Sequence, residues 1–449
     1  MSHLPRSTRR HFLSLMGATA TSSIFLKGCL GNPPSDSPTA PVNTVVSADQ
    51  PKPETTKIKL GYIPIVESAP IIIAQEKRFF AKHGMTEVEV SKQASWGAAR
   101  DNVVIGSQGG GIDGGMWQMP MPYYITEGRI TTNNQKVPMY VLLQLITHGN
   151  GIAIAGKHKG KGLTTKFAGG AKALFSNLKS AGTKFKAAYT FPGANQELWI
   201  RYWLAANGID PDRDVELKII PPAQMVADLK AGSIDGFCVG EPWNFRAAYE
   251  GVGFTVATDR EIWDGHPGKV LGVREDWAIA YPNTHIALVK ALLEACVYCA
   301  DPRHTEEIRE LIARKEYVGT KKEYIHLGSP ELNTCNLETP MREYAHHQFF
   351  GATVNRPSRT EHLWLAAQMA RWGEVPFPRN WVEVAERVCQ VGVFSTAARE
   401  IGLSEITYSK GAIHLFDGVS FSADNPIEYL HTLHIERNFT LAEIPLTAE

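Results

Sequence analysis

The sequence predicts an α/β protein with parallel strands, and three observations support this class. Segments of strand periodicity alternate with segments of helical periodicity up to about residue 275, an order typical of βαβ units. Their connections are short, and the 449 residues include 39 Gly and 27 Pro, which implies many turns. The hydrophobic fraction of 43% and charged fraction of 20% are those of a globular chain with room for two or three cores.

The elements follow one another in a regular order. Alternating or continuous apolar residues predict strands over residues 58–63, 87–90, 138–147, 185–191, 215–220 and 236–239. Helical periodicity predicts helices over residues 69–83, from Trp96, after residue 191, and over 223–231, 283–300, 305–314, 358–370 and 381–391. We expect the chain to end in short strand-like pieces near His414 and Tyr429.

A glycine-rich segment covers residues 106–115. It lacks the Gly-Lys-Ser/Thr ending of a phosphate-binding P-loop, and it does not fit the dinucleotide-binding pattern. We therefore expect a strand end where backbone approaches backbone or a small ligand.

The N-terminus has the features of an export signal. Arg9 and Arg10 form a twin-arginine pattern, a modestly apolar stretch follows, and the letters FLKGC end at Cys29 like a lipobox. Residues 1–29 are thus predicted to be a Tat-type lipoprotein signal with lipidation of Cys29. Residues 30–56 are rich in Pro, Ser, Thr and Asn, which predicts a flexible tether.

Charge and motifs exclude several function classes. Lys plus Arg and Asp plus Glu both number 46, so the basic excess of a nucleic-acid-binding protein is missing. No apolar run approaches the roughly 20 residues that a membrane span needs. The sequence contains no G-x-S-x-G or H-E-x-x-H motif, so we predict that the protein is not an enzyme.

The cysteines and the one close histidine pair are interpreted as structural. Beyond Cys29 there are five cysteines, an odd number that rules out a complete disulfide framework. The pair Cys296 and Cys299 has C-x-x-C spacing but lies inside a predicted helix, so both are expected to be buried thiols. His346 and His347 are expected at the surface, with metal binding as the alternative.

Six blocks of sequence resemble one known family. They are KLGYIPIVESAPIIIAQEK, EVSKQASWGAARDN, GGGIDGGMWQMPMPYYITEG, YTFPGANQELWIRYWLAANG, PPAQMVADLKAGSIDGFCVGEPW and FDGVSFSADNP. Together they resemble the lipoprotein receptors of nitrate and bicarbonate ABC transporters of cyanobacteria, over nearly the whole chain.

The resemblance implies a two-lobed periplasmic binding protein of type II. Each lobe would hold a mixed, mainly parallel sheet flanked by helices, with a ligand cleft between the lobes. Lobe 1 would comprise residues 57–147 plus 278–449, and lobe 2 residues 148–277. The chain would cross between lobes near 147–151 and 265–277, and these segments would form the hinge.

The resemblance also implies a set of ligand-binding residues. Asn150 and Gln196 match the bicarbonate receptors, whereas Lys269 matches the nitrate receptors. Bicarbonate receptors carry a Glu in the position of Lys269, and that Glu helps to hold a calcium ion. The full set, by position in this sequence, is Trp96, Gly97, Asn150, Thr190, Gln196 and Lys269.

These positions leave the ligand open between two anions. Nitrate accepts hydrogen bonds on every oxygen, and an ammonium at Lys269 would supply charge and donors, which slightly favours nitrate. Bicarbonate is the alternative, favoured by the lobe 1 sequence and by Gln196. Calcium is not expected, because Lys269 replaces the carboxylate and would repel the ion.

The predicted function is capture of a small oxyanion for an ABC permease and its ATPase. The protein would be lipid-anchored at the periplasmic face of the plasma membrane. The alternatives are a bicarbonate-specific receptor of the same family and an anion sensor without a transport role.

Overall fold

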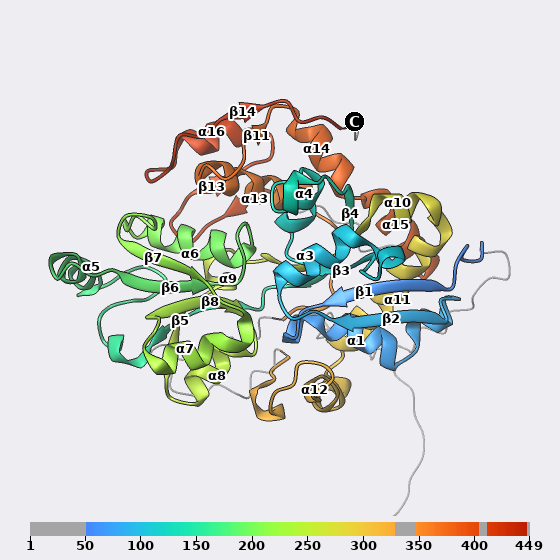
Figure 1. Ribbon diagram of the computed structural model, residues 1–449, viewed down its shortest axis with the longest axis horizontal. Helices are drawn as coiled ribbons and strands as arrows, with labels where there is room; N and C mark the ends of the chain where they lie inside the picture. The colour runs from blue at the N-terminus through green and yellow to red at the C-terminus, as the bar shows by residue number, and fades with distance from the viewer. Residues whose placement is uncertain (1–50, 328–346, 404–410, 447–449) are drawn as a thin grey trace, which may run out of the picture. The chain divides into compact units, whose positions relative to one another are not determined.

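The computed structural model (Figure 1) describes residues 51–327, 347–403 and 411–446 of the chain. The predicted signal, most of the tether and Cys29 lie outside these ranges, as do Cys335 and His346. The described residues contain two five-stranded sheets, each flanked by helices, which confirms the predicted α/β class.

The first sheet has the strand order β2-β1-β3-β10-β4. Its strands are β1 (Lys57–Tyr62), β2 (Glu87–Lys92), β3 (Gly114–Trp117), β4 (Met139–Thr147) and β10 (Pro267–Arg274). The strands β2, β1 and β3 pair in parallel, and β10 runs antiparallel to both of its neighbours. Four strands therefore share one direction, and only β10 is reversed.

The second sheet repeats this plan with the order β7-β6-β8-β5-β9. Its strands are β5 (Asn150–Ala155), β6 (Phe185–Tyr189), β7 (Val215–Ile219), β8 (Gly236–Gly240) and β9 (Gly253–Thr258). Here β5 is the reversed strand, antiparallel to β8 and β9. In Figure 1 this sheet is green, whereas β1, β2 and β3 of the first sheet are blue.

The reversed strand in each sheet is the one that the chain enters from the other sheet. Only two residues separate β4 from β5, and a short segment after β9 leads into β10. The sequence analysis placed residues 267–274 in the second lobe, but they pair with β3 and β4 of the first sheet. The second crossing thus precedes Pro267 instead of following it.

Helices pack on both sheets, and their bounds match most of the predicted ranges. In the first half of the chain they are α1 (Ala69–Glu76), α2 (Phe79–Lys82), α3 (Trp96–Ile105), α4 (Pro120–Thr126), α5 (Ala171–Ser180), α6 (Asn195–Ala206) and α7 (Met225–Ala231). They continue with α8 (Trp243–Tyr249), α9 (Asp259–Ile262), α10 (Glu275–Ala280), α11 (Pro282–Ala300), α12 (Thr305–Ala313), α13 (Arg359–Arg371), α14 (Trp381–Val388), α15 (Val391–Glu400) and α16 (Pro426–His431). In the described ranges, every helix is too short or too polar to cross a lipid bilayer.

Four sequence-based expectations had a local outcome. The helix predicted over 69–83 is interrupted at Arg78, whose φ of 60° is left-handed. The piece near Tyr429 is the helix α16 and not a strand, because its buried residues recur at helical spacing. His347 is buried, which corrects its surface assignment. Cys296 and Cys299 are buried in α11, as predicted.

The C-terminal third contacts the elements of both sheets. Trp364 of α13 stacks on Trp199 of α6, with ring centroids 5.1 Å apart, and Tyr202 of α6 donates a hydrogen bond to Asp417. After α14, the backbone N–H of Gln390 donates to the carbonyl of Val141 in β4. The segment that follows α13 is thus fastened to a helix of the second sheet and to a strand of the first.

A second segment, after α12, makes similar contacts. The carbonyl of Glu316 accepts a hydrogen bond from Tyr62 of β1 at 3.0 Å. Tyr324 of the same segment donates to Glu250, which directly follows α8, at 3.3 Å. Residues 316–324 therefore also join elements of the two sheets.

The glycine-rich segment ends in β3, where backbones approach closely, as predicted. A Cβ atom on Gly115 would lie 2.1 Å from the carbonyl oxygen of Gly61, and one on Gly114 would lie 2.5 Å from that of Gly272. Strand β3 is therefore held between β1 and β10 by the absence of side chains.

We expect Gly115→Ala to lower the free energy of unfolding by about 1–3 kcal/mol or more, because the added methyl group meets backbone atoms that cannot move aside. Denaturant titration monitored by circular dichroism would measure the loss. Gly392→Ala is the matched control, since a Cβ at that position of α15 meets nothing within 4 Å. Alanine should stabilise that helix by about 0.5–1 kcal/mol. Equal stability of the two variants would contradict the close approach.

Candidate functional site

The candidate site lies where strand ends of the two sheets come together. Strands that share a direction end at the same edge of a sheet, and the reversed strand begins there. Gln118, just after β3, donates to the Thr190 hydroxyl, just after β6, at 3.1 Å. The N–H of Val66, after β1, donates to the carbonyl of Glu241, after β8, at 2.9 Å. These bonds join the ligand-binding edges of both sheets.

Four of the six predicted residues form one hydrogen-bonded network. The Thr190 hydroxyl donates to Oε1 of Gln196 at 2.8 Å, and Nε2 of Gln196 donates to Oδ1 of Asn150 at 2.7 Å. Nζ of Lys269 donates to the same Asn150 oxygen at 3.3 Å. All four side chains are buried, and Lys269 has no exposed surface. The structure thus brings a lysine and three polar side chains from four separate elements or their ends to one point.

The other two predicted residues, Trp96 and Gly97, begin α3 beside this network. A Cβ on Gly97 would lie 3.5 Å from the ring of Phe191, the residue after Thr190. Within the described residues, the buried indole N–H of Trp96 has no hydrogen-bond partner. The first N–H groups of a helix also lack intrahelical acceptors. The start of α3 therefore offers N–H donors next to the network, which suits an anion.

Glu67 is the residue that the sequence analysis missed. It lies in a 3₁₀ turn (Val66–Ser68) between β1 and α1, and its Oε1 is 3.1 Å from Nζ of Lys269. Neither side chain has any exposed surface, and Oε2 of Glu67 has no hydrogen-bond partner in the described part of the chain. A signal was present, because Glu67 is the only charged residue among residues 60–75.

Two further carboxylates lie near the Lys269–Glu67 pair, and their protonation differs. Burial raises the pKa of Glu67 to about 7 and that of Glu241 to about 8. Burial alone would also raise the pKa of Asp259, but hydrogen bonds from His266 and Asn150 outweigh it and hold that pKa below its usual range. Asp259 is therefore the ionised carboxylate, whereas Glu67 and Glu241 can hold a proton near neutral pH.

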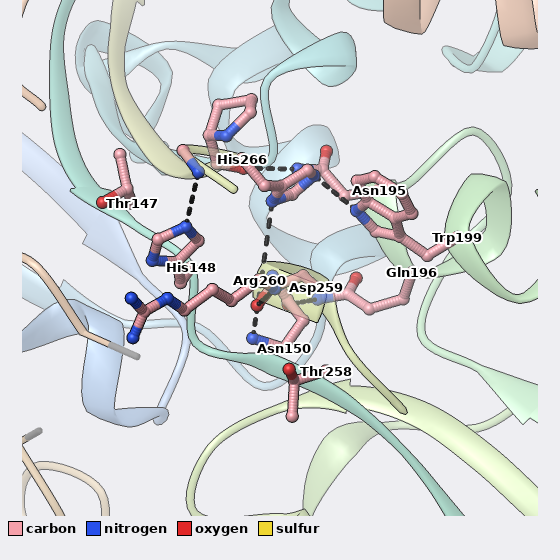
Figure 2. A network of polar contacts seen from close by, with 12 residues as sticks. Thr147, His148, Asn150, Asn195, Gln196, Trp199, Thr258, Asp259, Arg260 and His266 are labelled. Carbon is pink, nitrogen blue, oxygen red and sulfur yellow. Dashed lines mark hydrogen bonds and ion pairs between the residues drawn. The ribbon is translucent and has the colours of Figure 1, made fainter. Parts of the chain in front are cut away.

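Asp259 orients Asn150, as Figure 2 shows. Its Oδ2 accepts from the backbone N–H of Asn150 at 2.9 Å and from Nδ2 of the same residue at 2.8 Å. Because Nδ2 is held by Asp259, Oδ1 of Asn150 must face Gln196 and Lys269. One ionised carboxylate thus decides which end of the amide is presented to the site.

His266 supports Asp259 from the other side. The indole N–H of Trp199 donates to Nε2 of His266, so the ring proton is assigned to Nδ1, which lies 3.5 Å from Oδ2 of Asp259. Burial lowers the pKa of His266 to about 4. The imidazole is therefore neutral and donates to Asp259 without adding charge.

The two crossing segments lie side by side at the same place (Figure 2). The N–H of His148 donates to the carbonyl of His266 at 2.9 Å, and the N–H of Gly265 donates to Nε2 of His148 at 2.7 Å. Asn195, at the start of α6, donates to the carbonyl of Pro267 at 3.0 Å. The site is therefore built directly on the connections between the two sheets.

The site does not fit calcium, the ion that the family resemblance associates with bicarbonate. Calcium takes 6–8 oxygen ligands at roughly 2.3–2.6 Å. Here the ammonium of Lys269 already stands 3.1 Å from Glu67 and 3.3 Å from Asn150, between the oxygens that would bind the ion. Within the described ranges, no three His, Cys, Asp or Glu side chains are grouped to hold a metal ion.

Comparison with known proteins gives consistent relatives. The NMT1-like family matches residues 51–313. The bicarbonate-binding protein CmpA of Synechococcus elongatus is 40% identical over 462 aligned positions, which cover 97% of this chain and all of that protein. The crystal structure of the periplasmic nitrate-binding protein NrtA of Synechocystis superposes with a TM-score of 0.77 and 35% identity, covering 86% of this chain and all of that one.

Another relative is a longer protein of a different kind. The bicarbonate transport ATP-binding protein CmpC of Synechocystis is 55% identical over 393 residues, which cover 88% of this chain. The chain spans only 57% of the length of that relative.

We expect Glu241→Gln to stabilise the protein above about pH 8 and to leave it nearly unchanged near pH 4.5. The folded state holds the Glu241 proton up to about pH 8, whereas an unfolded chain releases it near 4.5. Wild-type stability therefore falls as the pH rises through this window, and Gln removes that loss, on the order of 1–3 kcal/mol. The hydrogen bond from the N–H of Phe245 to the side chain can persist.

Thermal unfolding between about pH 4.5 and pH 9 would measure the difference. Glu383→Gln, at an exposed position of α14, is the control and should follow the wild type at every pH. Parallel pH profiles for wild type and Glu241→Gln would show that Glu241 ionises normally in the folded protein.

Proposed function

The chain belongs to the NrtA/CmpA-type family of substrate-binding proteins, and we propose that it captures a small oxyanion, nitrate or bicarbonate, for an ABC importer. The single observation that carries this proposal is the buried network of Lys269, Asn150, Gln196 and Thr190 at the meeting edges of both sheets. Its one ammonium and several N–H groups suit an anion with few atoms.

The small size of such a ligand explains why the site must be buried. A planar anion of four heavy atoms gains at most about −1.5 kcal/mol per atom, or about −6 kcal/mol in all. Micromolar binding needs about −8 kcal/mol. Charge and hydrogen bonds in a water-excluded site have to supply the difference, because charge-assisted hydrogen bonds strengthen as the effective dielectric constant falls.

The proposed ligand contacts are the six residues named from the family resemblance. Lys269 would supply the charge, and Asn150, Thr190 and Gln196 the polar groups. Trp96 and the N–H of Gly97 would donate from α3. Because Lys269 has no exposed surface, an anion can reach it only when the two halves separate.

The proposed lobes follow the sheets, with one revision. Residues 57–147 with 278–449 would form lobe 1, and 148–277 lobe 2, except that β10 (Pro267–Arg274) goes to lobe 1 with its sheet. The hinge would then comprise His148 and Gly149 on one crossing and the residues just before Pro267 on the other.

The membrane partners are proposed on the family relationship. The NrtA relative is described as periplasmic, and CmpC as an ATP-binding protein of bicarbonate transport. This chain would deliver its anion to a permease driven by an ATP-binding subunit of that kind. Lipidation at Cys29 and the tether over 30–56 would hold it at the periplasmic face of the membrane.

An anion sensor is a second candidate, and one observation favours it. The chain is more similar to a region of the ATP-binding protein CmpC, at 55% identity, than to the binding protein CmpA, at 40%. ATP is cytoplasmic, so a domain joined to an ATP-binding protein would report on an anion that has already entered. Protease treatment of intact spheroplasts separates the two functions, because only a receptor outside the membrane would be digested.

We expect Lys269→Gln to weaken nitrate and bicarbonate binding by roughly 30-fold or more, which corresponds to the 2–5 kcal/mol that loss of a buried charged partner costs. Calorimetric titration of the purified full-length chain in CO₂-depleted buffer would measure both affinities. Lys290→Gln is the matched control: Lys290 is also buried and also pairs with a carboxylate, that of Glu400, but in α11. Unchanged affinity in Lys269→Gln would remove this lysine from the site.

We expect Cys29→Ser to move the protein from the membrane fraction to the soluble periplasmic fraction, because the lipid attachment site is lost. Fractionation followed by immunoblotting would show the change. Cys299→Ser is the control, since this thiol is buried in α11 and should not affect location. A Cys29→Ser variant that stays with the membrane would mean that the uncleaved signal is the anchor.

A further inference from the structure

The buried pair of Lys269 and Glu67 places a carboxylate inside the proposed anion site. Oε1 of Glu67 accepts from Nζ of Lys269, and Oε2 is buried without a hydrogen-bond partner in the described residues. Gly240 lines the other side of this carboxylate, since a Cβ there would lie 2.2 Å from Oε1. The carboxylate is therefore fixed in position, with one oxygen still able to accept.

Other charged groups around Glu67 make a second anion costly. Asp259 and Glu241 face it from α9 and from the end of β8, and both raise its pKa by repulsion or are raised by it. His347 also approaches: a Cβ on Gly149 would touch both its ring and Cγ of Glu67. Lys269 is the one cation that these items of charge share, so an incoming anion must offset the repulsion from Glu67.

The two candidate anions differ in how they can do so. Nitrate has only acceptor oxygens, so an ionised Glu67 repels it and leaves Oε2 unpaired. Bicarbonate carries one hydroxyl, whose proton can be donated to a carboxylate. A buried acceptor that is left unpaired penalises a ligand without a donor, which is how polar sites reject close analogues.

We propose that Glu67 is a specificity-determining residue that selects bicarbonate over nitrate: Oε2 accepts the ligand's hydroxyl hydrogen bond while Lys269 binds its charged oxygens. This proposal rests on the proposed oxyanion-binding function and deepens it. The selection requires no metal ion, because Lys269 supplies the positive charge in the site.

The test is calorimetric titration of the purified full-length chain with sodium bicarbonate and with sodium nitrate, at about pH 8 in CO₂-depleted buffer. We expect wild type to bind bicarbonate at least about tenfold more tightly than nitrate. Glu67→Gln keeps the shape, but its amide can donate to nitrate. We expect this variant to lower the ratio of the two affinities at least about tenfold, mainly by binding nitrate more tightly.

Glu374→Gln is the matched control. Burial likewise raises the pKa of Glu374, to about 8, but this carboxylate binds Tyr124 and lies outside the network. Its affinity ratio should equal that of wild type. An unchanged ratio in folded Glu67→Gln, or wild type that prefers nitrate, would overturn the selection by Glu67. Failure of wild type and Glu374→Gln to bind either anion would instead overturn the proposed function itself.

A pH series on wild type tests the proposal without any variant. Nitrate should bind only when Glu67 is protonated, so its affinity should rise as the pH falls from about 8 to about 6, through the pKa of about 7. If Glu67→Gln fails to fold, as judged by near-UV circular dichroism, this series decides. Nitrate affinity that stays constant across the range would overturn the proposal.

Discussion

The rest of the site depends on one constraint: a lysine with no exposed surface must have its charge balanced by its neighbours. Burial of an unpaired ammonium is costly, so Lys269 requires a carboxylate within reach, and Glu67 provides it at 3.1 Å. The second requirement is that polar atoms around the pair be satisfied. Asp259 meets it by holding Nδ2 of Asn150, which directs Oδ1 toward Lys269. Ligand recognition and charge burial are thus the same problem at this point of the fold.

Strand direction explains why these residues meet. Glu67, Gln118, Thr190, Glu241 and Asp259 all lie just beyond strands that share a direction within their sheet, whereas Asn150 and Lys269 lie in the first turns of the reversed strands. Short crossings between the sheets force those two strands to start where the others end. Residues far apart in sequence are therefore gathered at two facing edges, and hydrogen bonds across them close the network.

Much of the fold could be predicted from periodicity, because β1, β4, α11 and α13 bury apolar residues at regular spacing. The break at Arg78 could not, since a single left-handed residue leaves the apolar pattern intact. The place of β10 was assigned wrongly because order along the chain does not reveal which sheet a strand joins. At the site, Asn150, Thr190, Gln196 and Lys269 were found through the family resemblance. Glu67 was missed because its role arises only from the proximity of Lys269, 202 residues away.

The straps formed by residues 316–324 and by the segment after α13 bear on how fast the protein can exchange its ligand. A receptor joined only by two crossing segments opens by bending them. Here the ring stacking of Trp364 on Trp199 and the bond from Tyr202 to Asp417 must move or break as well. Each such contact that exists only in the closed form raises the barrier to opening, so residence time lengthens and the arrival rate falls. Turnover of the importer would then be set by how often the receptor opens.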